Sequence, residues 1–516
     1  MDTLRRVFCF CALAVTVMLL TGSSYAIPAF SRQYGTSCTT CHIDFPKLND
    51  FGKAFKDAGF KFPKDDETFI KIPPIMLGSP AQKELWPQRS IFPGTIPGIP
   101  QIGLRYNQFF QYTGSSANRY NQPQPPLGSL QSPLIPNTDF EPGFFSIFMA
   151  GNFGSDIAFW VDDDLSVFGA NSNGSLGDGY LRFVNIGRFF KLPTDALTLR
   201  VGQFELDLPF TQARSINISP YDIYTQANFG ASNQNVSNVI ELADAAHGVE
   251  FSGGHQYGGY HYSLAIVDQN TSGAAASPPN VPSPTGGTSG GVGFVSDTNY
   301  KDIYANFSYR FNLEKDPTSR HDIQAAGATG PRDHTYLSLG TFYYEGRSAQ
   351  RYSGLTSGGA ANVITAREPF YRVGGDFSFN YRTFNLFGLY MYGHDHDLLL
   401  NSTFTGFFPG AAATFNGGFL EADYLVLPWV MTIMRYDRVQ STADFLNGAG
   451  SGNYFSPAGT TRNRFTPGIQ FLIHPNIKAS FEYQYRPQQA LFYNSSGQAV
   501  EPFRTNTATG ALEFVY

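Results

Sequence analysis

The chain has 516 residues, of which 16% are aromatic and 15% are charged, and it contains 53 glycines and 29 tyrosines. Typical soluble domains carry about 25% charged residues, while the mean hydropathy of -0.20 excludes a bundle of membrane-spanning helices. The formal net charge of -6 is mild and argues against nucleic acid as a partner.

Residues 1–26 have the pattern of a secretory signal peptide. Two arginines at positions 5 and 6 precede an apolar run over residues 7–20, and Ser-Tyr-Ala at 24–26 fits cleavage between small residues. The alternative is an uncleaved anchor helix, but the apolar run is short for a membrane span. We expect export to remove residues 1–26, and the first two cysteines with them.

The two cysteines that follow the signal peptide stand in one motif. Cys38, Cys41 and His42 have the spacing C-x-x-C-H, which is the spacing of covalent c-type haem attachment. Each thiol would add to one haem vinyl group, and His42 would bind the iron as proximal ligand. A Cys38–Cys41 disulfide is the alternative in an oxidising compartment, although such a pair does not require His42. We predict one covalent haem c per chain.

The distal iron ligand is open at this stage. No histidine occurs between His42 and His247, which leaves no nearby second histidine. Met76, in the stretch IPPIMLG, is the only methionine between the signal peptide and Met149, and Met/His ligation raises the reduction potential of a haem. We predict Met76 as the distal ligand, with a linker role for Met76, a luminal histidine or an open iron site as alternatives.

The residues after the motif have helical spacing. Aromatic and aliphatic side chains recur every three or four residues from Phe45 to Phe55, Asn49 is suited to cap the start, and Gly59 is suited to end the helix. We expect this apolar stripe to pack on the edge of the haem.

Beyond residue 100 the pattern changes to period two, which predicts strands. In residues 477–485 (IKASFEYQY), Ile477 and Phe481 fall on one face while Lys478 and Glu482 fall on the other. About sixteen such segments follow one another. A soluble sandwich would also alternate, but its apolar face would be richer in valine and leucine.

Long and short connections alternate between these segments. The long ones cover approximately 114–141, 206–243, 267–299, 346–367, 394–416, 439–460 and 487–503, and the short ones include Gly154-Ser155, Arg382-Thr383, Leu427-Pro428 and His474-Pro475-Asn476. Long extracellular loops, short periplasmic turns and an even strand number are typical of bacterial outer-membrane barrels. Only 312–333 is long where a short turn is expected. We predict an all-β fold over residues 100–516, an outer-membrane β-barrel of about sixteen antiparallel strands, embedded in outer-membrane lipid.

The run PAFSRQYGTSCTTCHIDFPKLNDFGKAFKDAGF, residues 28–60, resembles the start of a known family, the outer-membrane monohaem cytochrome c–porin fusions, or iron-oxidising outer-membrane cytochromes. The shared features are Pro28, Phe30, Arg32, Gln33 and Gly35 before the motif and Pro46, Leu48, Gly52, Phe55, Lys56 and Gly59 after it. The resemblance implies a small N-terminal α-helical cytochrome plug and linker over residues 27–99, followed by the barrel.

The resemblance also implies a function, one-electron transfer through the haem across the outer membrane. Electrons would pass from extracellular Fe(II) to a periplasmic c-type cytochrome or another electron carrier, and Fe(II) oxidase activity would follow from that direction. Two alternatives stay open: outward electron transfer to extracellular acceptors, and a solute porin with an accessory haem plug. No hydrolase or nucleotide-binding motif competes with these interpretations.

Two further groups of residues are candidates for a role. His394 and His396, in GHDHD, would share one strand face near the outer mouth, and histidine ligands suit Fe(II); a solvated loop edge is the alternative. Charged residues of both signs fall on the predicted luminal face, where we expect them to dock the plug: Arg105, Arg310, Glu421, Asp423, Arg435, Asp437, Lys478, Glu482 and Arg486.

Overall fold

The structure is a computed structural model of the chain. It describes residues 29–36, 38–44, 46–62, 69, 74–75, 96–97, 101–113, 138–140, 144–153, 156–166, 176–211, 215–225, 245–268, 300–313, 335–355, 361–399, 411–441, 454–455, 461–474, 476–486, 492–493, 499–500 and 506–515. The predicted signal peptide, Met76 and most of the irregular connection at 312–333 lie outside the described residues.

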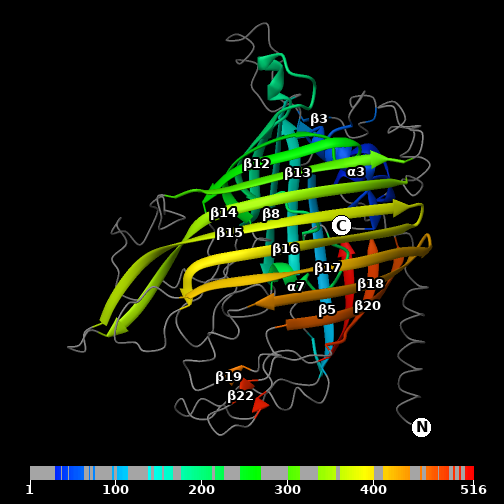
Figure 1. Ribbon diagram of the computed structural model, residues 1–516. Helices are drawn as coiled ribbons and strands as arrows, with labels where there is room; N and C mark the ends of the chain where they lie inside the picture. The colour runs from blue at the N-terminus through cyan, green and yellow to red at the C-terminus, as the bar shows by residue number, and fades with distance from the viewer. Residues whose placement is uncertain are drawn as a thin grey trace, which may run out of the picture.

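A closed antiparallel barrel makes up most of the described chain (Figure 1). Of the seventeen strands in its ring, β6 (Thr138–Asp139) has two residues and the other sixteen are long. The long strands are β5 (Gln101–Thr113), β7 (Phe144–Phe153), β8 (Ile157–Ser166), β9 (Leu176–Phe183), β10 (Thr198–Glu205), β11 (Ala245–Gly254), β12 (Gly259–Asp268), β13 (Asp302–Asn312), β14 (Tyr336–Leu355), β15 (Ala361–Tyr381), β16 (Phe384–Leu399), β17 (Ala411–Leu427), β18 (Val430–Ser441), β20 (Thr461–His474), β21 (Ile477–Gln484) and β24 (Thr507–Val515). Pairing of β24 with β5 closes the ring, which confirms the predicted fold and strand number.

The alternation of side chains follows the predicted faces. In β21, Lys478, Ser480 and Glu482 are buried toward the lumen, while Phe481 and Tyr483 are exposed on the outside. A closed barrel with an apolar outer face and a polar lumen satisfies its backbone hydrogen bonds in lipid. The protein is therefore a barrel of the bacterial outer membrane.

The two ends of the barrel differ in the length of their connections. The turn between β15 and β16 is Arg382–Thr383, as predicted, and that between β17 and β18 is Pro428–Trp429, one residue later than predicted. These short turns mark the periplasmic end. At the opposite end the hairpin of β14 and β15 projects past the other strands (Figure 1).

The N-terminal segment folds into short elements. These are α2 (Ala29–Tyr34), η1 (Cys38–Thr40), β1 (His42–Asp44), β2 (Lys47–Leu48) and α3 (Asp50–Asp57). The predicted helix is confirmed, because the Asn49 side chain caps α3 and Gly59, with φ +80°, follows its end. Tyr34, Phe51 and Phe55 form a small aromatic core that also meets the barrel wall.

The described residues of 206–225 turn back into the lumen. They include the short helix α7 (Asp222–Thr225), and Leu208 and Tyr221 are almost fully buried. The sequence predicted a long connection over 206–243, and β10 and β11 are indeed joined by one, but it did not predict that these residues enter the lumen. We call the described residues 206–211 and 215–225 the inserted loop.

The remaining described elements are small. They are β3 (Pro74–Ile75) paired with β4 (Ile96–Pro97), the sheet of β19 (Tyr454–Phe455), β22 (Phe492–Tyr493) and β23 (Ala499–Val500), and the 3-10 helix η2 (Ile186–Phe190). Within the described ranges, every helix is too short or too polar to cross a membrane.

Candidate functional site

The N-terminal segment is held inside the barrel by ion pairs to strands about a quarter of the ring apart. Lys47 Nζ lies 2.7 Å from Asp423 Oδ2 of β17 and 3.2 Å from Asn385 Oδ1 of β16. Four strands along the ring from β17, Arg310 of β13 binds Asp50 with two parallel hydrogen bonds of 2.6 and 2.7 Å. A bidentate arginine–carboxylate pair fixes orientation as well as distance.

Backbone carbonyls of the segment supply further anchors. Arg182 of β9 donates to Lys56 O at 2.8 Å, and Asn152 of β7 donates to Gly59 O at 3.3 Å. The barrel partners all lie near the periplasmic ends of their strands, where Asn152, Asn385 and Asp423 stand beside short turns. The segment therefore occupies the periplasmic mouth of the lumen.

The C-x-x-C-H motif forms a tight turn braced by α3. Cys41 N donates to Cys38 O at 3.2 Å, and Asn49 N donates to Cys41 O at 2.9 Å. The Asn49 side chain donates to Thr40 O at 2.9 Å and accepts from Gly52 N at 2.8 Å. A Cβ on Gly52 would lie 2.1 Å from Cys41 O, so only glycine lets the helix approach the motif this closely.

Burial sets the protonation states of the motif. Cys38 and Cys41 are free thiols, and burial raises the pKa of Cys41 to about 12 and that of Cys38 as well, so both stay neutral. Burial also lowers the pKa of His42 to about 4. The neutral imidazole is the form that binds iron.

The orientation of His42 also fits haem binding. Its Nδ1 lies 3.2 Å from Pro46 O, and a ligand histidine usually donates its other ring N–H to a carbonyl, which fixes the tautomer. Two unbonded thiols and one oriented neutral histidine therefore fit a covalently attached haem. Met76, the predicted distal ligand, lies outside the described residues.

The two predicted metal-capture histidines do lie together. On β16, Phe387, Leu389 and Met391 face the lumen, so His394 and His396 face outward near the outer rim. Their ring centroids are 4.2 Å apart. The described part of the chain contains no group of three or more metal-ligating side chains, so an iron site at this pair stays a prediction.

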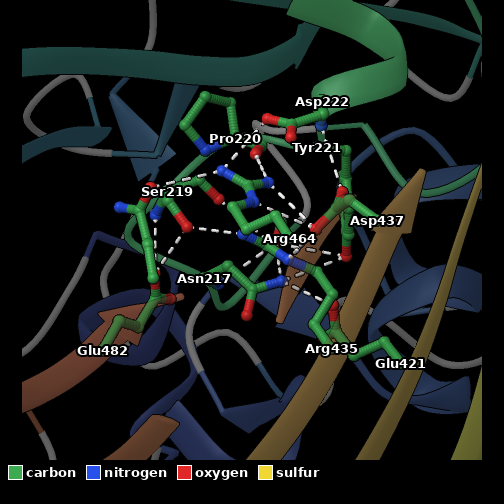
Figure 2. Close-up of polar contacts among 12 residues, drawn as sticks. Asn217, Ser219, Pro220, Tyr221, Asp222, Glu421, Arg435, Asp437, Arg464 and Glu482 are labelled. Carbon is green, nitrogen blue, oxygen red and sulfur yellow. Dashed lines mark hydrogen bonds and ion pairs between the residues drawn. The ribbon is translucent and has the colours of Figure 1, made fainter. Parts of the chain in front are cut away.

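Charged wall residues hold the backbone of the inserted loop (Figure 2). Arg435 Nη1 donates to Ser219 O at 2.9 Å, and Arg464 Nη2 donates to Pro220 O at 2.6 Å. Glu482 accepts from Ser219 N at 3.0 Å and from its hydroxyl at 2.6 Å. The loop is thereby tied to β18, β20 and β21.

These wall charges neutralise one another. Asp437 lies 3.0 Å from both Arg435 Nε and Arg464 Nη2, and Arg464 Nη1 lies 3.1 Å from Asp222 of the loop (Figure 2). Arg435 and Asp437 have no exposed surface. A buried network of this kind needs every charge matched, so the loop belongs to the folded barrel.

Apolar side chains of the inserted loop complete the filling of the lumen. Tyr221 stacks on Phe419 of β17 with centroids 3.9 Å apart, and Phe210 packs on Phe387 at 4.7 Å. Both belong to a cluster that reaches Phe370 near the outer end. The lumen is thus occupied at two levels, by the N-terminal segment and by the inserted loop.

The inserted loop was missed from the sequence, although a signal was present. Leucine, isoleucine and tyrosine recur through Leu206, Leu208, Ile216, Tyr221 and Ile223, and a solvated loop does not need them. The sequence predicted that the luminal charges dock the N-terminal segment, and of these Arg310 and Asp423 do so. Arg435, Asp437 and Glu482 hold the inserted loop instead. Arg105 and Lys478 pair with Glu513 of the wall.

No protein-family model and no curated protein matches the chain. Among solved structures, OmpT, an outer membrane protein of Vibrio cholerae, is 9% identical with a TM-score of 0.44, covering 83% of this chain and 99% of that one. An anion-selective porin from Comamonas acidovorans is 11% identical with a TM-score of 0.43, covering 80% and 98%. The outer membrane channel DcaP of Acinetobacter baumannii is 9% identical with a TM-score of 0.39, covering 80% and 96%.

Proposed function

We propose that the protein is an outer-membrane electron conduit that carries one c-type haem in the mouth of a closed barrel. The observation that supports this most is the position of the C-x-x-C-H segment, docked in the lumen through Lys47 and Arg310. When bound, the haem would supply a one-electron carrier, with Cys38 and Cys41 as attachment points and His42 as proximal ligand. Met76 remains our proposal for the distal ligand.

The filled lumen supports electron transfer over solute passage. A general porin has a polar, water-filled interior, whereas the inserted loop here buries Tyr221 against Phe419. In this proposal an extracellular donor such as Fe(II) gives up one electron and becomes Fe(III) without entering the barrel. The electron leaves to a periplasmic c-type cytochrome or another carrier.

The barrel fold is also compatible with a rival function, that of a solute porin with an accessory haem plug. Two measurements separate the proposals. A pyridine haemochrome spectrum and intact mass should show one covalent haem per chain, and anaerobic Fe(II) should reduce the oxidised protein. Liposomes that carry it should not swell in sugars; swelling with no haem reduction would favour the porin, and reduction only by strong reductants would favour outward transfer.

A further inference from the structure

Two neighbouring carboxyl groups of the wall lie between the N-terminal segment and the inserted loop. Glu421 and Asp423 are two residues apart on β17, so both point into the lumen, and they are 0% and 3% exposed. Asp423 Oδ2 accepts from Lys47 Nζ at 2.7 Å. Glu421 Oε2 accepts from Asn217 Nδ2 of the inserted loop at 2.7 Å (Figure 2).

The second oxygen of each carboxyl group does not take part in these contacts. Glu421 Oε1 and Asp423 Oδ1 are both buried, and neither has a hydrogen-bond partner among the described residues. A buried carboxylate oxygen without a donor is costly, and two adjacent carboxylates in a site of low dielectric resist carrying two negative charges. A proton on one carboxyl group of the pair removes one of the two negative charges.

The charged and titratable neighbours of the pair among the described residues come from β18, the inserted loop and the N-terminal segment. Arg435 of β18 is the cross-strand partner of Glu421, but its hydrogen bonds and ion pair go to Ser219 and Asp437. Tyr221 of the inserted loop and Lys47 of the N-terminal segment complete the set. Burial alone would lower the pKa of Lys47, but Asp423 and Glu421 raise it above its ordinary value, so the ammonium stays charged.

We propose that Glu421 and Asp423 form a proton-binding site coupled to the electron carried by the N-terminal segment. The coupling part rests on the proposed function, whereas the proton site does not. Lys47 follows the predicted ligand His42 by five residues and binds Asp423 directly, so charge at the motif acts on the pair through Lys47. Arrival of one electron adds one negative charge, and the pair takes one proton from periplasmic water; departure of the electron returns it.

The proton itself is tested in a protein that needs no haem. The Cys38→Ser, Cys41→Ser double variant should show an infrared band of a protonated buried carboxyl group that shifts in heavy water. Glu421→Gln should abolish this band. Glu250→Gln is the matched control, because Glu250 is buried in the lumen but paired with Arg200 at 2.5 Å, and it should keep the band. No band in the double variant, or a band that survives Glu421→Gln, overturns the site.

The coupling is tested by redox titration of the haem-loaded protein at several pH values. The midpoint potential should fall with pH by up to about 59 mV per unit, the tenfold change in proton activity converted for a one-electron couple. Glu421→Gln should flatten the slope, Glu421→Asp should restore part of it, and Glu250→Gln should leave it unchanged. An equal slope in wild type and Glu421→Gln overturns the coupling. A chain that binds no haem refutes the proposed function instead, and leaves the infrared test standing.

Discussion

The N-terminal segment and the inserted loop both fill the lumen, but they are stabilised in different ways. The segment has its own core, in which Tyr34 stacks on Phe62 and Phe51 meets Phe62 edge-on. The inserted loop has no such core, since Tyr221 and Leu208 pack into the cluster of the barrel wall. One is a small folded unit bound to the barrel, and the other is part of the barrel.

The difference also appears in the contacts with the wall. The segment meets the wall at separate polar anchors, chiefly Arg310–Asp50 and Lys47–Asp423. The inserted loop is held by a continuous buried network around Arg435 and Asp437. Loss of an anchor should therefore release the segment from an intact barrel, whereas damage to the network should weaken the barrel itself.

The largest effect is expected from removing the attachment chemistry of the segment alone. The Cys38→Ser, Cys41→Ser variant should lose covalent haem and all electron transfer, because no other described cysteine can replace these thiols. The barrel should fold as before, since neither side chain bonds to the wall. Pyridine haemochrome spectra measure the haem, and heat-modifiable migration in gels measures the barrel. A variant that keeps covalent haem would refute the assignment of the site.

Arg435→Met should give the next largest effect, a loss of about 3–5 kcal/mol of barrel stability, because it leaves Asp437 buried with one partner fewer. Urea unfolding in detergent or lipid measures it. Arg438→Met, on the exposed face of the same strand, is the matched control and should change stability little. If the two variants unfold alike, the network does not hold the barrel together.

Arg310→Ala should act on docking, with a cost on the order of 2 kcal/mol for the lost charged hydrogen bonds to Asp50. Cleavage of the segment by protease should rise, while urea unfolding of the barrel changes less than in Arg435→Met. A cycle with Asp50→Ala isolates the pair. Unchanged protease resistance in Arg310→Ala would mean that this anchor does not hold the segment.

Asn49→Ala should have the smallest effect, about 1 kcal/mol from loss of the α3 cap, confined to the segment. The yield of haem-loaded protein should drop because the motif loses its bond between Asn49 and Thr40. Asn49→Asp keeps the cap acceptor and loses only the donor to Thr40, so it should fall between wild type and Asn49→Ala. Equal yields of all three would show that α3 does not brace the motif.

Much of the architecture follows from local sequence patterns. Period-two alternation in β21 separates Lys478 from Phe481 and so predicts which residues face the lumen and which face lipid. The cap at Asn49 likewise depends only on nearby residues. Such features need no knowledge of distant parts of the chain, which is why the sequence predicts them.

The partners of the luminal charges could not be predicted, because they depend on contacts between distant segments. Asp423 meets Lys47 across 376 residues, and Glu482 meets Ser219 across 263. Alternation places each charge in the lumen but does not say which segment fills it. The inward turn of the inserted loop was missed for the same reason.

The most direct test uses liposomes that contain the haem-loaded protein and a trapped, oxidised soluble c-type cytochrome. Fe(II) is added outside without oxygen, and the absorbance of the trapped cytochrome is followed while light scattering reports sugar entry. A conduit with a filled lumen should reduce the trapped cytochrome without admitting sugar. The Cys38→Ser, Cys41→Ser variant should neither reduce the cytochrome nor admit sugar. Reduction that is equally fast with the double variant, or that appears only together with sugar entry, would contradict the account.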